Sequence, residues 1–251
     1  TVDDEPLSFV SNLALAPDGK IYFTEATTRF HPKEHGGVGE AGFFDILEHS
    51  ASGRLLVYDL QTKMTKVLLT NLNFPHGVSV AEDGRFVLVC ETGAYRIRKL
   101  WLTSDKFGKS DVIVDNLPGF PDNISRGREG RFWIGLVARR STLLDAFSNW
   151  PFLRSRVARF PKILRPTLSD EGHVIAINQE GEVLVSLQDH TQTTRAISGA
   201  VETDSGLLLT STTMSDLGIL DKEHYRELLK QKRSLKDDKS ARVSTATHPI
   251  R

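Results

Sequence analysis

The sequence predicts an all-β protein of the β-propeller class. Four segments of the chain share one hairpin pattern, and further strand-like runs lie between them. Repeated four-stranded units at periods of roughly 40 to 50 residues are typical of propeller blades. We therefore expect about four blades over residues 1–220, with the fourth blade lacking its outermost strand.

Each of the four segments has a short run, a tight turn that ends in glycine, and a second run rich in β-branched and aromatic residues. They are NLALAPDGKIYFTEA from Asn12, GVSVAEDGRFVLVCET from Gly77, NISRGREGRFWIGLV from Asn123 and AVETDSGLLLTST from Ala200. We expect positive φ at the turn glycines, because that conformation closes a hairpin tightly. These glycines are Gly19, Gly84, Gly130 and Gly206.

Two regions depart from the strand pattern. In the insertion 139–165, apolar residues recur at helical spacing and basic residues outnumber acidic ones. We expect a helical cap that packs over one end of the propeller; a lid that also touches an anionic membrane surface is the alternative. The region 221–251 is a highly charged tail whose second half we expect to be disordered, and we assign it no chemistry.

Composition narrows the class of protein. The 32 Lys and Arg residues balance 32 Asp and Glu residues, which argues against a nucleic-acid binder that depends on a large basic excess. Cys90 is the single cysteine of the chain, so no disulfide forms within it. No apolar run approaches the roughly 20 residues that span a bilayer. Because the first residue is Thr1, we expect the natural start and any targeting signal to lie upstream.

The phrase GFPDNI at 119–124 raises the question of a site. It precedes an inner strand, and the phrases SFVSN, NFPHG and AISG precede the other inner strands, where the loops of a propeller converge on its channel. A hard cation prefers several oxygen ligands, which such loops supply one each. Alternatively, Asp122 is an ordinary turn residue, and His76 is either a general base or a histidine satisfied by its neighbours.

Other candidate motifs are weak. His31 and His35 in HPKEH have zinc-ligand spacing, but Pro32 and the following pair of glycines argue against the helix that such a site needs. The phrase FGKS lacks the earlier glycine of a phosphate loop, and no Gly-x-Ser-x-Gly occurs.

At NLPGFPDNI the sequence resembles the strictosidine synthase-like proteins. The phrases RLLVYDLQTKMTKVLL, NFPHGVSV, FVLVCETGAYRIRKLWL and GRFWIGLV follow in the same order as in that family. The resemblance runs from about Ser8 to Leu220 and is fullest to the bacterial and adipocyte plasma membrane-associated branch. It implies a six-bladed propeller of the wider group that contains gluconolactonase, or senescence marker protein, and the paraoxonases. It also implies that two blades precede residue 1.

The resemblance further implies an axial divalent cation, usually calcium. The family's Glu ligand falls upstream of this chain, and Ser11 stands where an Asn ligand is expected, with Asn12 beside it. His76 stands at a second Asn ligand, and Asp122 is retained. The implied metal set is Asp122, His76, Asn12 and Ser11, although imidazole suits zinc or iron better than calcium.

The function implied by the resemblance is metal-dependent hydrolysis of esters or lactones, of the arylesterase or lactonase kind. The expected catalytic residues are His76 and Asp122, and the partner is a small-molecule ester or lactone. The alternative is a catalytically degraded propeller that acts as a binding or interaction scaffold. A third hypothesis, strictosidine synthase-type condensation, is disfavoured because its Glu falls at Gly199, with Glu202 three residues on. The compartment and oligomeric state stay open; some relatives carry an N-terminal membrane anchor.

Overall fold

The computed structural model describes residues 1–2, 5–103, 105–141, 145–146, 154, 169–189, 193–223, 225–227 and 229–230. Every structural statement below concerns these residues. The predicted insertion 139–165 falls largely outside them, as does the tail beyond residue 230. Among the helices of this part of the chain, none has the length and apolar character needed to cross a bilayer.

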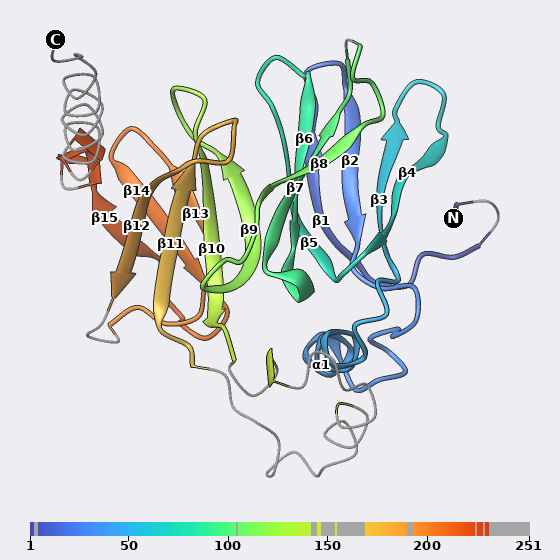
Figure 1. The fold of residues 1–251 in the computed structure, drawn as a ribbon, viewed down its shortest axis with the longest axis horizontal. Helices are drawn as coiled ribbons and strands as arrows, with labels where there is room; N and C mark the ends of the chain where they lie inside the picture. The colour runs from blue at the N-terminus through green and yellow to red at the C-terminus, as the bar shows by residue number, and fades with distance from the viewer. Residues whose placement is uncertain are drawn as a thin grey trace, which may run out of the picture.

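The strands form four sheets that follow one another along the chain, as expected for successive blades (Figure 1). The first two blades have the strand orders β1-β2-β3-β4 and β5-β6-β7-β8. Neighbouring strands are antiparallel throughout, which is the arrangement that tight hairpins produce. Their bounds are Val10–Leu15, Lys20–Glu25, Gly53–Asp59, Thr65–Leu72, Pro75–Val80, Phe86–Glu91, Arg96–Trp101 and Ser110–Val114.

The third blade has the order β9-β10-β11-β12, and the fourth has only β13-β14-β15 within the described residues. The prediction of about four blades is therefore confirmed. The inner strands β1, β5, β9 and β13 lie side by side along the axis. The bounds of the seven strands are Gly119–Arg126, Phe132–Arg139, Gly172–Ile177, Val183–Asp189, Ile197–Glu202, Gly206–Ser211 and Gly218–Asp221.

Three apolar cores hold the blades together, one at each junction of neighbouring blades. The first packs Tyr22 and Val57 against Val89, the second packs Leu88 against Ile134, and the third surrounds Trp133. Because the side chains of a strand alternate between the two faces of its sheet, the second and third blades, which have a neighbour on each side, each contribute to two cores.

The outward faces of the first and fourth blades have no such partner. On the first blade, Val2 and Leu7 pack over the cluster of Phe23 and Leu56, but Leu13 and Leu15 on the inner strand are 64% and 65% exposed. On the fourth blade, Val201, Leu208 and Ile219 lie in register across β13, β14 and β15 and form an apolar row. Val201 and Ile219 of this row are 46% and 69% exposed.

The turn glycines follow the prediction in three of four cases. Gly19, Gly84 and Gly130 have φ angles of 81°, 70° and 72°. The prediction was wrong for Gly206, which has no positive φ and begins β14 instead. A Cβ there would lie 2.5 Å from the carbonyl oxygen of Leu220, so this glycine permits close approach of β15.

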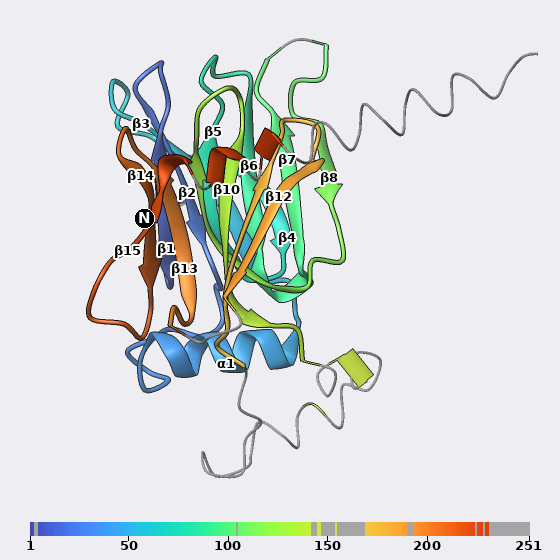
Figure 2. The ribbon, with the colours of Figure 1, turned by 90° about the vertical axis from the view of Figure 1, so that its left-hand side faces the viewer.

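Helix α1 (Val38–Glu48) lies across one end of the blades, below the strands in Figures 1 and 2. It follows β2 and begins after Gly37, whose φ is 108°. This helix was not predicted from the sequence, because three glycines at its start hide its amphipathic pattern. The short 3₁₀-helix η1 (Thr92–Ala94) follows β6 near the same end.

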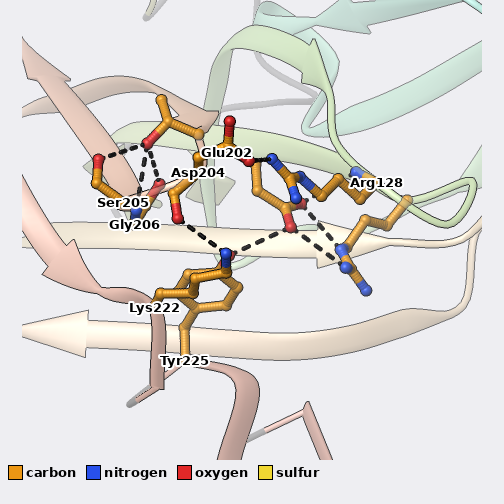
Figure 3. A network of polar contacts seen from close by, with 9 residues as sticks. Arg128, Glu202, Asp204, Ser205, Gly206, Lys222 and Tyr225 are labelled. Carbon is orange, nitrogen blue, oxygen red and sulfur yellow. Dashed lines mark hydrogen bonds and ion pairs between the residues drawn. The ribbon is translucent and has the colours of Figure 1, made fainter.

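The fourth blade is joined to the third by a buried carboxylate, Glu202, at the end of β13 (Figure 3). It accepts hydrogen bonds from Arg131 Nε at 3.0 Å, Trp133 Nε1 at 2.9 Å and the Tyr225 hydroxyl at 3.2 Å. Burial acts to raise the pKa of Glu202, but the hydrogen bonds outweigh it and lower the pKa to about 2. Tyr225, which belongs to the predicted tail, is fully buried against Trp133 in this junction.

Candidate active site

The same short phrase leads into each inner strand at the end of the propeller that carries α1. Phe9, Phe74 and Phe120 occupy one position of this phrase in the first three blades, and Ala196 occupies it in the fourth. Two residues further on, the chain places a polar residue on the inner strand of every blade. These residues are Ser11, His76, Asp122 and Ser198.

His76 and Asp122 are brought together from the neighbouring strands β5 and β9. Nδ1 of His76 lies 2.9 Å from Oδ1 of Asp122, which is an ion-pair distance, although the ring is not aligned for a regular hydrogen bond. The His76 side chain is 24% exposed and the Asp122 side chain 10%. The imidazole therefore has one nitrogen at a carboxylate, and Nε2 forms no hydrogen bond with the described residues.

The backbone of the pair is fixed by two threonines. The Thr24 hydroxyl of the first blade donates to the carbonyl of His76 at 2.5 Å. The Thr92 hydroxyl donates to the carbonyl of Pro121 at 2.6 Å, just before Asp122. These contacts hold the two side chains in position from both sides, which is what a preorganised site requires.

Asn12 reaches across from the first blade but contacts the neighbour of Asp122. Its Nδ2 donates to Oδ1 of Asn123 at 2.6 Å. Gly199 makes room here, because a Cβ at that position would lie 3.2 Å from Cβ of Asn123. The hydroxyl oxygen of Ser11 is buried and has no hydrogen-bond partner in the described part of the chain.

A cavity of about 430 Å³ opens above the His76–Asp122 pair. Phe9, Phe74 and Phe120 line it from the blades, and the ring of Phe9 meets that of Phe74 edge to face, with 5.7 Å between ring centroids. Helix α1 forms its roof through Gly42, Phe43, Ile46 and Leu47, among others. The cavity thus combines apolar walls with one polar pair, as small-molecule sites commonly do.

Two buried glutamates position the walls of this cavity. Glu25 accepts a hydrogen bond from the backbone N–H of Ser8 at 2.7 Å, immediately before Phe9, and pairs with Arg54 of β3. Glu91 likewise accepts from the backbone N–H of Asn73 at 3.1 Å, immediately before Phe74. Both glutamates end the second strand of their blade, so each anchors the phrase that enters the axis.

Arginines keep Glu91 ionised. Burial acts to raise the pKa of Glu91, but hydrogen bonds from Arg96 and Arg98 of β7 outweigh it, and the pKa is lowered. The role of the two glutamates was not predicted from the sequence. The signal was present as an internal repeat, since FTEA precedes GRLLVYD as VCETG precedes YRIRKLW.

Cys90 is excluded as a nucleophile. Its side chain is fully buried, and burial first, with the Asp122 carboxylate second, raises the pKa of the thiol well above its ordinary value. A thiol that stays protonated is a poor nucleophile.

The implied calcium set does not fit the residues that the structure brings together. Calcium takes six to eight oxygen ligands, whereas Asp122 supplies the one carboxylate of the predicted set and is already in contact with an imidazole. Asn12 is committed to Asn123. In the portion of the chain described here, no three His, Cys, Asp or Glu side chains cluster so as to hold a metal ion.

Strand β13 begins at Ile197, at the cavity end, and Glu202 lies at the opposite end of the strand. Its carboxylate is taken up by the junction between the third and fourth blades, and Gly199 on the same strand faces Asn123. Neither residue supplies a carboxylate to the axial site.

Comparison with known proteins places these features in context. The family model described as strictosidine synthase matches residues 11–105. The strictosidine synthase-like protein 13 of Arabidopsis thaliana is 35% identical over 193 residues, which cover 75% of this chain and 46% of that protein. The adipocyte plasma membrane-associated protein of Bos taurus is 34% identical over 195 residues, with the same shares. The chain spans about half the length of these relatives.

Solved propellers share the fold. A gluconolactonase from Xanthomonas campestris superposes with a TM-score of 0.56 at 14% identity, over 84% of this chain and 57% of that one. A calcium-binding regucalcin from Agrobacterium tumefaciens gives a TM-score of 0.51 at 14% identity, over 87% and 57%. At this identity the likeness demonstrates the architecture alone.

Proposed function

We propose that this chain, which belongs to the strictosidine synthase-like propeller family, is a hydrolase that cleaves esters or lactones at the His76–Asp122 pair. The observation that carries the proposal is the 2.9 Å contact between imidazole and carboxylate at the base of an apolar cavity. An imidazole oriented by a carboxylate is a general base that activates water or another nucleophile.

In the proposed mechanism, Nε2 of His76 takes a proton from a water molecule that attacks the carbonyl carbon of the substrate. The imidazolium that forms is stabilised by the Asp122 carboxylate beside Nδ1. When the tetrahedral intermediate collapses, the C–O bond to the leaving group breaks and His76 returns the proton to the leaving oxygen.

The apolar walls of the cavity hold the rest of the substrate. Phe9, Phe74 and Phe120 on one side and α1 on the other exclude water from the reacting carbonyl, which strengthens the charge interactions at the pair. The mechanism routes no step through a metal, because the donor set around Asp122 does not suit calcium. Metal dependence remains a prediction from the family resemblance.

The test uses phenyl acetate and a series of simple lactones with the wild-type chain, His76→Gln, Asp122→Asn and a control, His31→Gln. His31 lies in the loop before α1 and does not line the cavity. We expect kcat/KM to fall by about 10²–10⁴ for the two site variants, the range for loss of a general base, and to be unchanged for the control. Equal activity of all four proteins would refute the assignment.

Metal analysis of the purified chain tests the calcium expectation separately. A stoichiometric divalent ion that is lost in His76→Ala, with activity lost in parallel, supports metal dependence. Full activity in the presence of EDTA supports the metal-free mechanism above.

A binding propeller is the second candidate function. The absence of a carboxylate at Gly199 and the His76 substitution at a family ligand position favour it. In that case the wild-type chain is inert towards every ester and lactone, yet an apolar fluorescent probe binds the cavity and a bulky Gly39→Phe substitution on α1 displaces it.

A further inference from the structure

A second cavity, of about 290 Å³, lies beside the C-terminal end of α1. Ile46 lines both this cavity and the larger one, so the last turn of α1 separates the two. We call the second cavity the basic pocket, because three arginines and a histidine line it. Its lining residues include His49, Asn73, Tyr95, Arg96, Arg140 and Arg154, together with a single acidic residue, Asp145.

Two of the three arginines are ion-paired. Arg96 donates two hydrogen bonds to Glu91, each at 2.8 Å. Arg140 pairs with Asp145 at 2.6 Å and covers the ring of Tyr95 at 4.5 Å. These two guanidinium groups therefore form the wall of the pocket and each contacts a carboxylate, although Arg96 shares Glu91 with Arg98.

Arg154 is different. Its side chain is buried, at 8% exposure, and the carboxylate that acts on it electrostatically, Asp145, is already paired with Arg140. Nη2 donates to the carbonyl of Ile46 at 3.0 Å, and Nε is buried with no hydrogen-bond partner in the described structure. A second buried polar atom of the pocket lining, Oδ1 of Asn73, is in the same state.

One role of Arg154 is plain from this geometry. The last carbonyls of a helix lack intrahelical partners, and α1 has no basic residue in its last turn, so Arg154 caps it from outside. This contact uses one of the five N–H groups of the guanidinium. A buried cation with an unpartnered donor, here Nε of Arg154, is costly unless a counter-ion satisfies it.

We propose that the basic pocket binds a small oxyanion, a carboxylate or phosphate group, with Arg154 as its principal ligand. A guanidinium presents a planar pair of donors that matches such groups. The neighbouring groups suit this ligand. Burial is the main cause that raises the pKa of Tyr95, to about 12, so its hydroxyl remains a neutral donor. Burial, followed by Arg154 and Arg96, lowers the pKa of His49 and keeps the ring from adding charge of its own.

The proposal does not depend on the proposed hydrolysis. The oxyanion could be a free ion or the headgroup of an acidic lipid, since both present the same charged oxygens. Because the ligand would hold Arg154, and Arg154 holds the carbonyl of Ile46, occupancy would also restrain the last turn of the helix that roofs the larger cavity.

The experiment is titration calorimetry with inorganic phosphate and with acetate at constant ionic strength. The proteins are the wild-type chain, Arg154→Gln, Arg154→Lys and a control, Arg139→Gln. Arg139 lies on β10 with its side chain 52% exposed, and it pairs with Glu171 outside the pocket. We expect saturable binding to wild type and control, and about tenfold weaker or no binding to Arg154→Gln, the effect of losing a charge-assisted hydrogen bond. Arg154→Lys keeps the charge and should retain intermediate affinity.

A second arm measures co-sedimentation with phosphatidylcholine vesicles that contain phosphatidic acid. Vesicle binding that needs Arg154, without binding of either free ion, supports the proposal and identifies the headgroup as the source. The proposal is overturned if no anion binds the wild-type chain in either arm. It is also overturned if Arg154→Gln melts at a lower temperature but binds anions as the wild type does, since Arg154 would then be a helix cap only.

Discussion

Asn12 and Asn123 meet across the propeller axis although their blades are not neighbours: Nδ2 of Asn12 donates to Oδ1 of Asn123 at 2.6 Å. The strand between them, β5, carries Gly77 at the corresponding position. A Cβ on Gly77 would lie 2.4 Å from the carbonyl oxygen of Asp122. The missing side chain lets β5 and β9 approach each other closely beside the His76–Asp122 pair.

We expect the amide contact to be cooperative. In a double-mutant cycle of Asn12→Ala and Asn123→Ala, measured by urea denaturation, the coupling energy should be about 1 kcal/mol in favour of the pair. Strictly additive losses would show that the two amides act independently.

Substitution of Gly77 by Ala should be strongly destabilising, since the added methyl group overlaps the backbone of β9. We expect a loss of about 2–3 kcal/mol in the free energy of unfolding, typical of an overpacked site, together with loss of esterase activity. Gly39→Ala is the matched control. It adds the same methyl group to α1, where nothing lies within 4 Å, and should stabilise the chain by up to about 1 kcal/mol.

Glu202, at the junction of the third and fourth blades, predicts that the stability of the fold decreases in acid. The pKa of Glu202 is about 2 in the folded chain, below the ordinary value of 4.5. The unfolded chain therefore takes up this proton first as the pH falls, and the stabilisation is complete above about pH 4.5 and is lost towards pH 2. Glu202→Gln should cost about 2 kcal/mol at pH 7, a figure reduced for partial solvent screening.

Urea denaturation of both proteins between pH 7 and pH 3 gives the measurement. The difference between wild type and Glu202→Gln should shrink as the pH falls. Asp204→Asn is the control in the same blade, because its 94% exposed side chain makes a surface ion pair with Arg128 and should matter little. If the difference in unfolding free energy between wild type and Glu202→Gln stayed constant across the pH range, the lowered pKa of Glu202 would be contradicted.

The buried carboxyl group of Asp45 on α1 predicts that stability depends on pH in the opposite direction to that predicted for Glu202. The carboxyl group of Asp45 is 1% exposed, and burial raises its pKa from 3.8 to about 6, against hydrogen bonds from Thr27 and Ser52 that act to lower it. Ionisation is thus easier in the unfolded chain, so stability declines as the pH rises from about 4 to 6. Asp45→Asn should raise the melting temperature at pH 7.5 and lose this advantage below pH 4.

Glu48→Gln is the control for Asp45→Asn on the same helix, since Glu48 pairs with Arg29 at the surface. Its melting temperature should change little at either pH. If Asp45→Asn lowered the melting temperature at pH 7.5, the Asp45 carboxylate would be stabilising the fold rather than opposing it.

The sequence predicted the blades because hairpin turns and β-rich runs are local features. It placed His76 and Asp122 in loops that precede adjacent inner strands, whereas the structure has them on the strands themselves, β5 and β9, with their side chains in contact. It could not give the partner of Asn12, which depends on two glycines in other blades. Nor did it give α1, where the pattern is diluted by glycine, or the burial of Tyr225, which follows from the position of Glu202 in space.

The two outward faces of the arc have a consequence for self-association. The face that carries Leu13 and Leu15 differs from the face that carries Val201 and Ile219, so a two-fold pair of copies buries both kinds of face only if the two arcs close into a ring. A copy that docks its last blade on the first blade of another leaves one face of each kind free at the ends of the pair. Growth by this contact repeats without a stopping point unless the rotation between copies closes a ring.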